Sequence, residues 1–180
     1  VGRDFGQGGL RSTGATFDLG LDGNGFFKVG APDGEQYTRD GRFRLDDAGR
    51  ITTQDGLPLL DEGGGPIVID PKDGAVSIAQ DGTVSQGEAI LGKVGVARFD
   101  NLTVLEKVGD NRYRNTSNEQ PVAAPEVVMH QGMLEGSNVK PISEITRMIQ
   151  VTRAYESMAK MMDANAELSR RSIERMGKLN

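Results

Sequence analysis

Cysteine and tryptophan are both absent from this sequence of 180 residues. Without cysteine, the chain has no disulfide scaffold, no thiolate metal site and no cysteine nucleophile. No apolar run approaches the ~20 residues that a helix needs to cross a bilayer. Residues 1–15 lack the basic and apolar regions of a signal peptide, and the chain begins without methionine, as a fragment or a processed protein does.

The charge is modestly acidic and unevenly distributed. From Val139 onward, eight Lys or Arg residues stand against five Asp or Glu residues, a balance of +3. Because the whole chain has a formal charge of −5, residues 1–138 carry −8. With 26% charged and 36% hydrophobic residues, the composition is that of a soluble globular protein, not of a nucleic-acid binder or an inserted membrane protein.

Glycine is abundant, with 25 residues, and many glycines directly follow an aspartate. Such pairs suit the positive φ angles of tight hairpin turns. The pairs, together with Asn24-Gly25, are Asp22-Gly23, Asp33-Gly34, Asp40-Gly41, Asp55-Gly56, Asp73-Gly74 and Asp81-Gly82. Short apolar segments separate them. The predicted fold is therefore mainly β, a hairpin-rich antiparallel body followed by a long C-terminal α-helix.

We expect three parts along the chain. Residues 1–15 form an extended, Gly-rich and weakly held arm, residues 16–130 a β-domain, and residues 131–180 a C-terminal helical assembly segment. Within the β-domain, residues 101–108 predict a short strand or one helical turn. Tyr113 falls in a polar loop over residues 111–120, and residues 121–125 have the composition of a linker.

The C-terminal segment has the spacing of a coiled coil. Pro141 suits the first turn of a helix, and no further glycine or proline occurs before Gly177. Residues at intervals of three and four form a seam, eight of the ten being apolar or aromatic: Ile145, Met148, Thr152, Tyr155, Ala159, Met162, Ala166, Ser169, Ile173 and Met176. About 36 helical residues would span roughly 54 Å.

No second segment of the chain carries a helical period, so this stripe has no evident partner. Apolar surface left in water costs roughly 25 cal/mol per Å². The helix therefore either folds back across the β-domain or packs against helices of other subunits. The periodicity does not separate the two arrangements. The opposite charges of body and helix favour the second.

The sequence contains no catalytic constellation. His130 is the single histidine, and a zinc site built on it would need three carboxylates, an uncommon set. The aspartates do not follow the alternating ligand series of a calcium-binding loop. No phosphate loop and no Gly-x-Ser-x-Gly elbow is present. We therefore expect no enzyme activity, no metal and no cofactor, and place His130 at the junction of body and helix.

Two regions carry motifs. Residues 16–29 read Thr-Phe-Asp-Leu-Gly-Leu-Asp-Gly-Asn-Gly-Phe-Phe-Lys-Val, and residues 37–45 read Tyr-Thr-Arg-Asp-Gly-Arg-Phe-Arg-Leu. Residues 131–139 read Gln-Gly-Met-Leu-Glu-Gly-Ser-Asn-Val, and Arg-Ala-Tyr-Glu begins at Arg153. Both regions resemble the rod and hook proteins of the bacterial flagellum. The matching residues are Gly25, Phe26, Phe27, Gln131, Gly132, Leu134, Glu135, Ser137, Asn138, Val139, Arg153, Ala154 and Tyr155.

The resemblance implies a structural subunit that stacks helically into the axial drive shaft of the basal body. That rod crosses the periplasm, transmits torque and forms the export channel, and its subunits leave through the flagellar type III apparatus. Its partners are further copies and other rod subunits. The seam residues would then pack between subunits. Residues 113–131 and the ending Ser172 to Gly177 resemble the proximal-rod members most, with the distal-rod members as the close rival.

One part of the family pattern has no counterpart here. The N-terminal helix of the family, with its Asn-Asn-Ile-Ala-Asn-like motif, is missing, so the resemblance implies a truncated form. The competing interpretation is a secreted adhesin or binding module with the helix as a stalk. It requires a surface cleft or an exposed aromatic cluster, for which Phe26 and Phe27 are the candidates.

Overall fold

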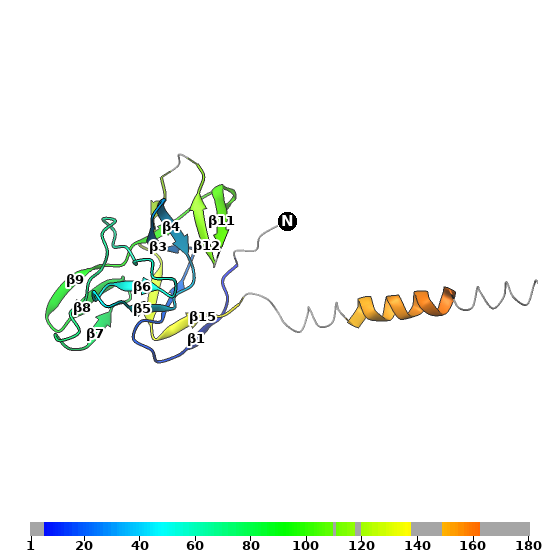
Figure 1. Ribbon diagram of the computed structural model, residues 1–180, viewed down its shortest axis with the longest axis horizontal. Helices are drawn as coiled ribbons and strands as arrows, with labels where there is room; N and C mark the ends of the chain where they lie inside the picture. Colours follow the sequence, from blue (N-terminus) through cyan, green and yellow to red (C-terminus); the bar gives the residue numbers. More distant parts are fainter. Residues whose placement is uncertain (1–5, 110, 118–119, 138–148, 163–180) are drawn as a thin grey trace, which may run out of the picture. The chain divides into compact units, whose positions relative to one another are not determined.

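Antiparallel strands dominate the computed structural model, which describes residues 6–109, 111–117, 120–137 and 149–162. The chain divides into two units, residues 1–138 and residues 139–180. All the strands lie in the first unit, and residues 149–162 of the second form an α-helix (Figure 1). The predicted fold class is confirmed, while the coiled-coil character of the helix stays a prediction. Within the described residues, no helix is both long and apolar enough to span a membrane.

The largest sheet is built around one hairpin. Strands β3 (Phe26–Ala31) and β4 (Gly34–Thr38) are joined by a two-residue turn at Pro32 and Asp33. Four further strands extend the hairpin on its two sides: β10 (Val96–Arg98), β13 (Val122–Ala123), β12 (Arg112–Asn115) and β11 (Leu105–Gly109). The spatial order is β11-β12-β4-β3-β10-β13, so strands distant in sequence meet at the hairpin.

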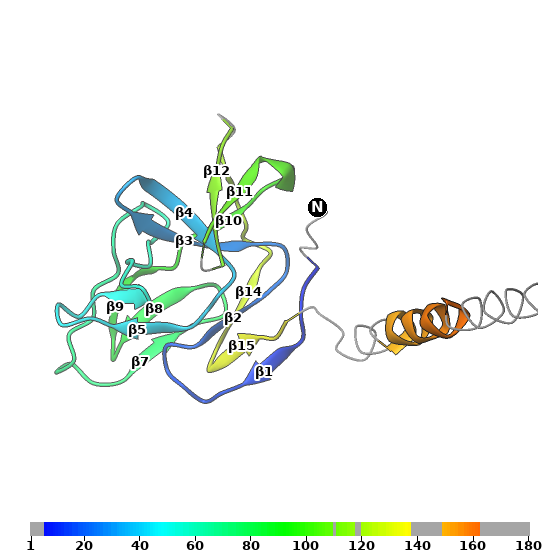
Figure 2. The ribbon, with the colours of Figure 1, turned by 45° about the vertical axis from the view of Figure 1, so that its right-hand side comes forward.

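Smaller sheets complete the first unit. Strand β2 (Leu19–Asp22) pairs with β14 (Val128–Gln131), as Figure 2 shows, and β1 (Leu10–Ser12) pairs with β15 (Met133–Glu135). The remaining strands form one hairpin and one three-stranded sheet: β5 (Phe43–Leu45), β6 (Ile51–Thr53), β7 (Val76–Ile78), β8 (Thr83–Gln86) and β9 (Ala89–Lys93).

Most of the Asp-Gly pairs form turns as predicted. Five of the glycines have positive φ angles, between 85° and 119°: Gly23, Gly34, Gly56, Gly74 and Gly82. Gly41 differs, because its φ angle is not positive and it lies against β2. A Cβ atom at this position would be 1.7 Å from the Leu19 carbonyl oxygen, and the Gly41 carbonyl accepts a hydrogen bond from the Leu19 N–H at 2.9 Å. Gly41 therefore permits a close backbone approach rather than a hairpin turn.

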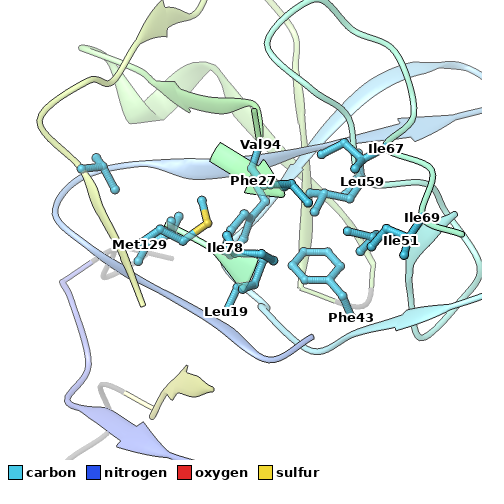
Figure 3. Close-up of a cluster of buried hydrophobic side chains, with 14 of the residues drawn as sticks. Leu19, Phe27, Phe43, Ile51, Leu59, Ile67, Ile69, Ile78, Val94 and Met129 are labelled. Atoms are coloured by element: carbon cyan, nitrogen blue, oxygen red, sulfur yellow. The ribbon is translucent and has the colours of Figure 1, made fainter. Parts of the chain in front are cut away.

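The main hydrophobic core lies among the small sheets and one face of β3. Phe27 is fully buried at its centre, and its ring meets that of Phe43 edge to face at a centroid distance of 5.1 Å (Figure 3). Aliphatic side chains from distant parts of the chain surround the pair: Leu19, Leu21, Val29, Ile51, Leu59, Ile67, Ile69, Ile78, Val84, Val94 and Met129.

A second cluster covers the opposite face of the six-stranded sheet. Phe26, Tyr37 and Phe99 are buried there, and the Tyr37 and Phe99 rings lie 4.8 Å apart in an edge-to-face contact. Tyr113 packs on this cluster, with its ring 5.9 Å from that of Phe26. The expectation of a polar loop around Tyr113 was wrong, because residues 112–115 form β12 and deliver the ring to the sheet.

Three segments differ from the expected organisation. The arm is fastened, because residues 10–12 form β1 and pair with β15. The expected linker at residues 121–125 contains β13, which pairs with β10. The first residues of the expected C-terminal segment, ahead of the predicted helix start at Pro141, continue as strand through Glu135. Residues 102–104 form one 3-10 turn, and β11 follows it directly. The segment predicted as a short strand or one helical turn therefore contains both.

Candidate assembly site

The described part of the C-terminal helix presents its side chains to solvent. Of the predicted seam residues, Thr152, Tyr155, Ala159 and Met162 lie within it, and all four are exposed. Tyr155 is 78% exposed and Met162 is 70% exposed. Residues three and four apart share one face of a helix, so these four form a continuous strip. Ile145, Met148, Ala166 and Ile173 lie outside the described residues.

The exposed apolar surface is wider than the predicted seam. Val151, Met158 and Met161 are 67%, 64% and 72% exposed. Their spacing places them beside the predicted seam, and methionine side chains adapt to irregular packing surfaces. The motif residues Arg153 and Ala154 are exposed on the same helix.

In the first unit, the motif residues Phe26 and Phe27 are core residues. They are 4% and 0% exposed, so they do not form an exposed aromatic cluster, one of the two features that the binding-module interpretation could rest on. Gly25 is buried beside them, and a Cβ atom there would lie 2.7 Å from Val96 Cγ1 and 3.0 Å from Val127 Cγ2. The Gly-Phe-Phe motif thus contributes buried residues to the centre of the six-stranded sheet.

Gln131 and Gly132 form the corner between β14 and β15. The Gln131 side-chain amide donates to the Thr16 and Val76 carbonyl oxygens at 3.0 and 3.2 Å, while its oxygen accepts from the Ile78 N–H at 3.1 Å. Gly132 has a φ angle of 74°. Its carbonyl oxygen accepts from the Thr13 N–H at 2.8 Å. These two motif residues join the arm and β7 to the end of the β-body.

Glu135 is the most enclosed charge at this end of the body. Its Oε2 lies 2.7 Å from Arg39 Nε, and the two side chains are 11% and 17% exposed. The other oxygen, Oε1, accepts a hydrogen bond from the Gly8 N–H at 2.8 Å. Arg39 also donates to the Gly23 and Gly25 carbonyl oxygens at 2.9 and 2.7 Å. One ion pair therefore connects both motif regions with the arm.

The remaining motif residues continue this strand. Leu134 lies half-buried in β15 opposite Arg11. Ser137 is exposed just beyond the strand, and Asn138 and Val139 lie outside the described residues. Glu135 was named by the motif, but its partnership with Arg39 was not predicted, because the two residues lie 96 positions apart.

A polar cleft of about 410 Å³ opens beside the β4 end of the large sheet. Two ion pairs line it: Asp40 Oδ2 lies 2.5 Å from Arg42 Nη2, and Asp55 Oδ2 lies 3.8 Å from Arg112 Nη2. The lining contains no histidine or cysteine: Thr38, Asp40, Arg42, Thr53, Gln54, Asp55, Lys107, Asn111 and Arg112.

His130 lies in β14, half-buried and paired with Gly20 of β2. Among residues 6–109, 111–117, 120–137 and 149–162, no group of three or more His, Cys, Asp or Glu side chains could hold a metal ion. Two features remain. In the second unit, the described helix has an exposed apolar strip, and in the first unit, β15 is held by the Arg39–Glu135 ion pair.

Comparisons with known proteins agree with this description. Residues 20–86 match the flagellar hook protein FlgE/F/G D1 domain, and residues 130–175 match the C-terminal domain of the flagellar basal body rod FlgEFG proteins. The flagellar basal-body rod protein FlgF of Caulobacter vibrioides is 53% identical over 180 residues, which cover all of this chain and 74% of that relative.

Two further relatives are more distant. The FlgF protein of Mesorhizobium japonicum is 35% identical over 95% of this chain and 71% of its own length. The flagellar basal-body rod protein FlgG of Bacillus subtilis is 36% identical over 88% of this chain and 64% of its own length. Both rod types that the motifs indicated are therefore among its relatives, and the chain belongs to the FlgE/F/G family of flagellar rod and hook proteins.

Proposed function

We propose that this chain is a FlgF-type structural subunit of the flagellar basal-body rod, and that its segment from Val139 onward packs against other rod subunits. The observation that carries the assembly role is the exposed apolar strip of the helix. Tyr155 and Met162 are more than two-thirds exposed, at 78% and 70%. A helix of this composition is stabilised when its apolar face is covered.

The β-body supports a structural role rather than catalysis. Its motif residues build the core and fasten the strand that leads to the helix. Four of the charged side chains that line the polar cleft form two ion pairs, Asp40–Arg42 and Asp55–Arg112. We therefore assign the body no reaction. Copies of this chain and other rod subunits supply the cover for the helix, and the assembled rod transmits torque and encloses the export channel.

The test is a comparison of Tyr155→Asp with Ser157→Asp in the full chain. Both substitutions place a carboxylate at an exposed helical position. Only Tyr155 belongs to the predicted seam, because two residues along a helix turn the side chain by about 200°. We expect Tyr155→Asp to abolish capture by an immobilised FlgG-type rod subunit and Ser157→Asp to retain it. Light scattering of each chain would report self-association.

Equal capture of both variants would contradict the seam. A wild-type chain that stays monomeric at high concentration and captures no rod subunit would contradict the assembly role itself.

A further inference from the structure

We propose that Glu135, held by Arg39, is the anchor through which mechanical load carried by the chain beyond Ser137 enters the β-body. The inference deepens the proposed rod function and rests on it, since a subunit of a rotating shaft must pass force between its assembly segment and its body. It concerns residues of the first unit alone.

The path of the chain determines where such a load arrives first. A pull on the chain beyond Ser137 reaches the Gly136 N–H, which donates to the Gly9 carbonyl oxygen at 2.9 Å. The next residue is Glu135, which pairs with Leu10 at the end of the β1–β15 ladder. Figure 1 shows these two strands side by side. The ladder continues with Arg11 opposite Leu134 and Ser12 opposite Met133, so the pair of Glu135 and Leu10 is the first that the load meets.

The side chain of Glu135 adds further bonds at the end of the β1–β15 ladder where the load arrives. Its carboxylate is bound by Arg39 Nε at 2.7 Å and by the Gly8 N–H at 2.8 Å. Hydrogen bonds with an ionised partner are about twice as strong as neutral ones. Separating the pair would also leave two nearly buried charges unpaired, which is strongly unfavourable.

Arg39 passes the load into the centre of the fold. Its Nη1 donates to the carbonyl oxygens of Gly23 and Gly25, in the turn between β2 and β3. Phe26 and Phe27 follow this turn directly and anchor the two hydrophobic clusters. Two routes therefore lead from Ser137 into the body. The backbone through β15 and β14 reaches the main cluster at Met129, and the Glu135–Arg39 pair reaches the turn that precedes Phe26 and Phe27.

Hydrogen exchange on the full chain tests whether the anchor acts locally. Glu135→Gln keeps the size of the side chain and removes its charge. We expect exchange of the Gly8, Gly136 and β1 amides to accelerate by at least about tenfold, with the β3 amides unchanged. The matched control is Glu62→Gln, which removes the exposed Glu62–Lys93 pair, whose Glu62 side chain is 59% exposed. Unchanged exchange of the Gly8, Gly136 and β1 amides, or uniform acceleration throughout the body, would overturn the proposal.

Constant-force measurements test the mechanical role directly. Because the natural sequence has no cysteine, handles can be attached at two introduced sites, Asp47→Cys in the exposed β5–β6 turn and Asn180→Cys. We expect an early release of β15, with a lifetime at constant force that Glu135→Gln shortens by at least about tenfold and Glu62→Gln leaves unchanged.

An unchanged lifetime in Glu135→Gln would reject the anchor while leaving the rod function standing. Failure of the wild-type chain to capture rod subunits would reject the rod function while leaving the measured lifetimes intact. The two outcomes are therefore distinguishable.

Discussion

Phe26 and Phe27 are adjacent in the chain, yet their side chains belong to different hydrophobic clusters on opposite faces of β3. Phe27 meets Phe43 in the main core, whereas Phe26 meets Phe99 and Tyr113 in the second cluster. This division follows from the strand, since consecutive side chains of a β-strand point to opposite faces. One dipeptide therefore connects the two cores of the body.

Truncation of Phe27 should be severely destabilising. Phe27 is 0% exposed, and replacing a fully buried phenylalanine by alanine typically costs about 3–5 kcal/mol. We expect Phe27→Ala to lower the free energy of unfolding in urea by this amount. Phe17→Ala makes the same chemical change at a half-buried position beside the core and should cost clearly less. Equal losses in the two variants would contradict the central place of Phe27.

Gly41 should not accept even one extra methyl group. A Cβ atom there would lie 1.7 Å from the Leu19 carbonyl oxygen, so Gly41→Ala must push β2 away and break the Leu19 N–H to Gly41 hydrogen bond. We expect a loss of several kcal/mol in urea unfolding, or failure to fold. Gly9→Ala is the matched control, because no atom lies within 4 Å of the added methyl group. A tolerated Gly41→Ala would refute the close approach.

Tyr37 should make the protein sensitive to alkali. Burial, and then the negative charge of Glu35, raise the pKa of the Tyr37 hydroxyl well above its ordinary value of 10.0. The hydroxyl keeps its proton in the folded state, whereas the unfolded chain loses it near pH 10. Stability is therefore complete below this pH and falls as pH rises above it.

Tyr37→Phe should remove this part of the alkaline loss, as measured by urea unfolding at about pH 9 and about pH 11. The phenylalanine variant also keeps the edge-to-face contact with Phe99. A wild-type protein and a variant with the same alkaline slope would show that the hydroxyl does not contribute.

Asp40 should contribute to stability at neutral pH and lose that contribution in acid. Partial burial disfavours its charge, but hydrogen bonds and the positive charge of Arg42 outweigh this and hold the pKa of the Asp40 carboxyl below its ordinary value of 3.8. The contribution is present above that ordinary value and disappears as pH falls through the lower folded value.

Asp40→Asn should therefore flatten the decline in stability between about pH 4 and about pH 2, measured by thermal unfolding. Arg42→Gln removes the partner and should flatten the same part of the curve. A decline as steep as that of the wild-type protein in both variants would exclude a contribution from this pair.

Local chemistry made much of the fold predictable. The Asp-Gly pairs marked five turns correctly, since a tight turn and its positive φ angle depend on adjacent residues. Gly41 was misread because its role depends on a strand elsewhere in the chain. Tyr113 was placed in a loop for a similar reason: β12 is polar on one face, and its pairing with β4 cannot be read from neighbouring residues.

The candidate site was predictable to a different degree in its two parts. The position of the apolar strip on the helix can be predicted, because its residues recur every three or four positions within one continuous segment. The Arg39–Glu135 pair has no such local signal. The strand β1 is three residues long and directly follows Gly9, and its partner lies near the other end of the body. The local composition of a short strand carries little information about which distant strand it pairs with.

The pairing of Leu10 with Glu135 also has a consequence for how the protein is made. The strand nearest the beginning of the chain can find its place only after nearly the entire body has been synthesised. Closing so long a loop adds an entropic barrier and slows folding. The newly made polypeptide therefore keeps β1 without its partner strand until residues 133–135 have been synthesised.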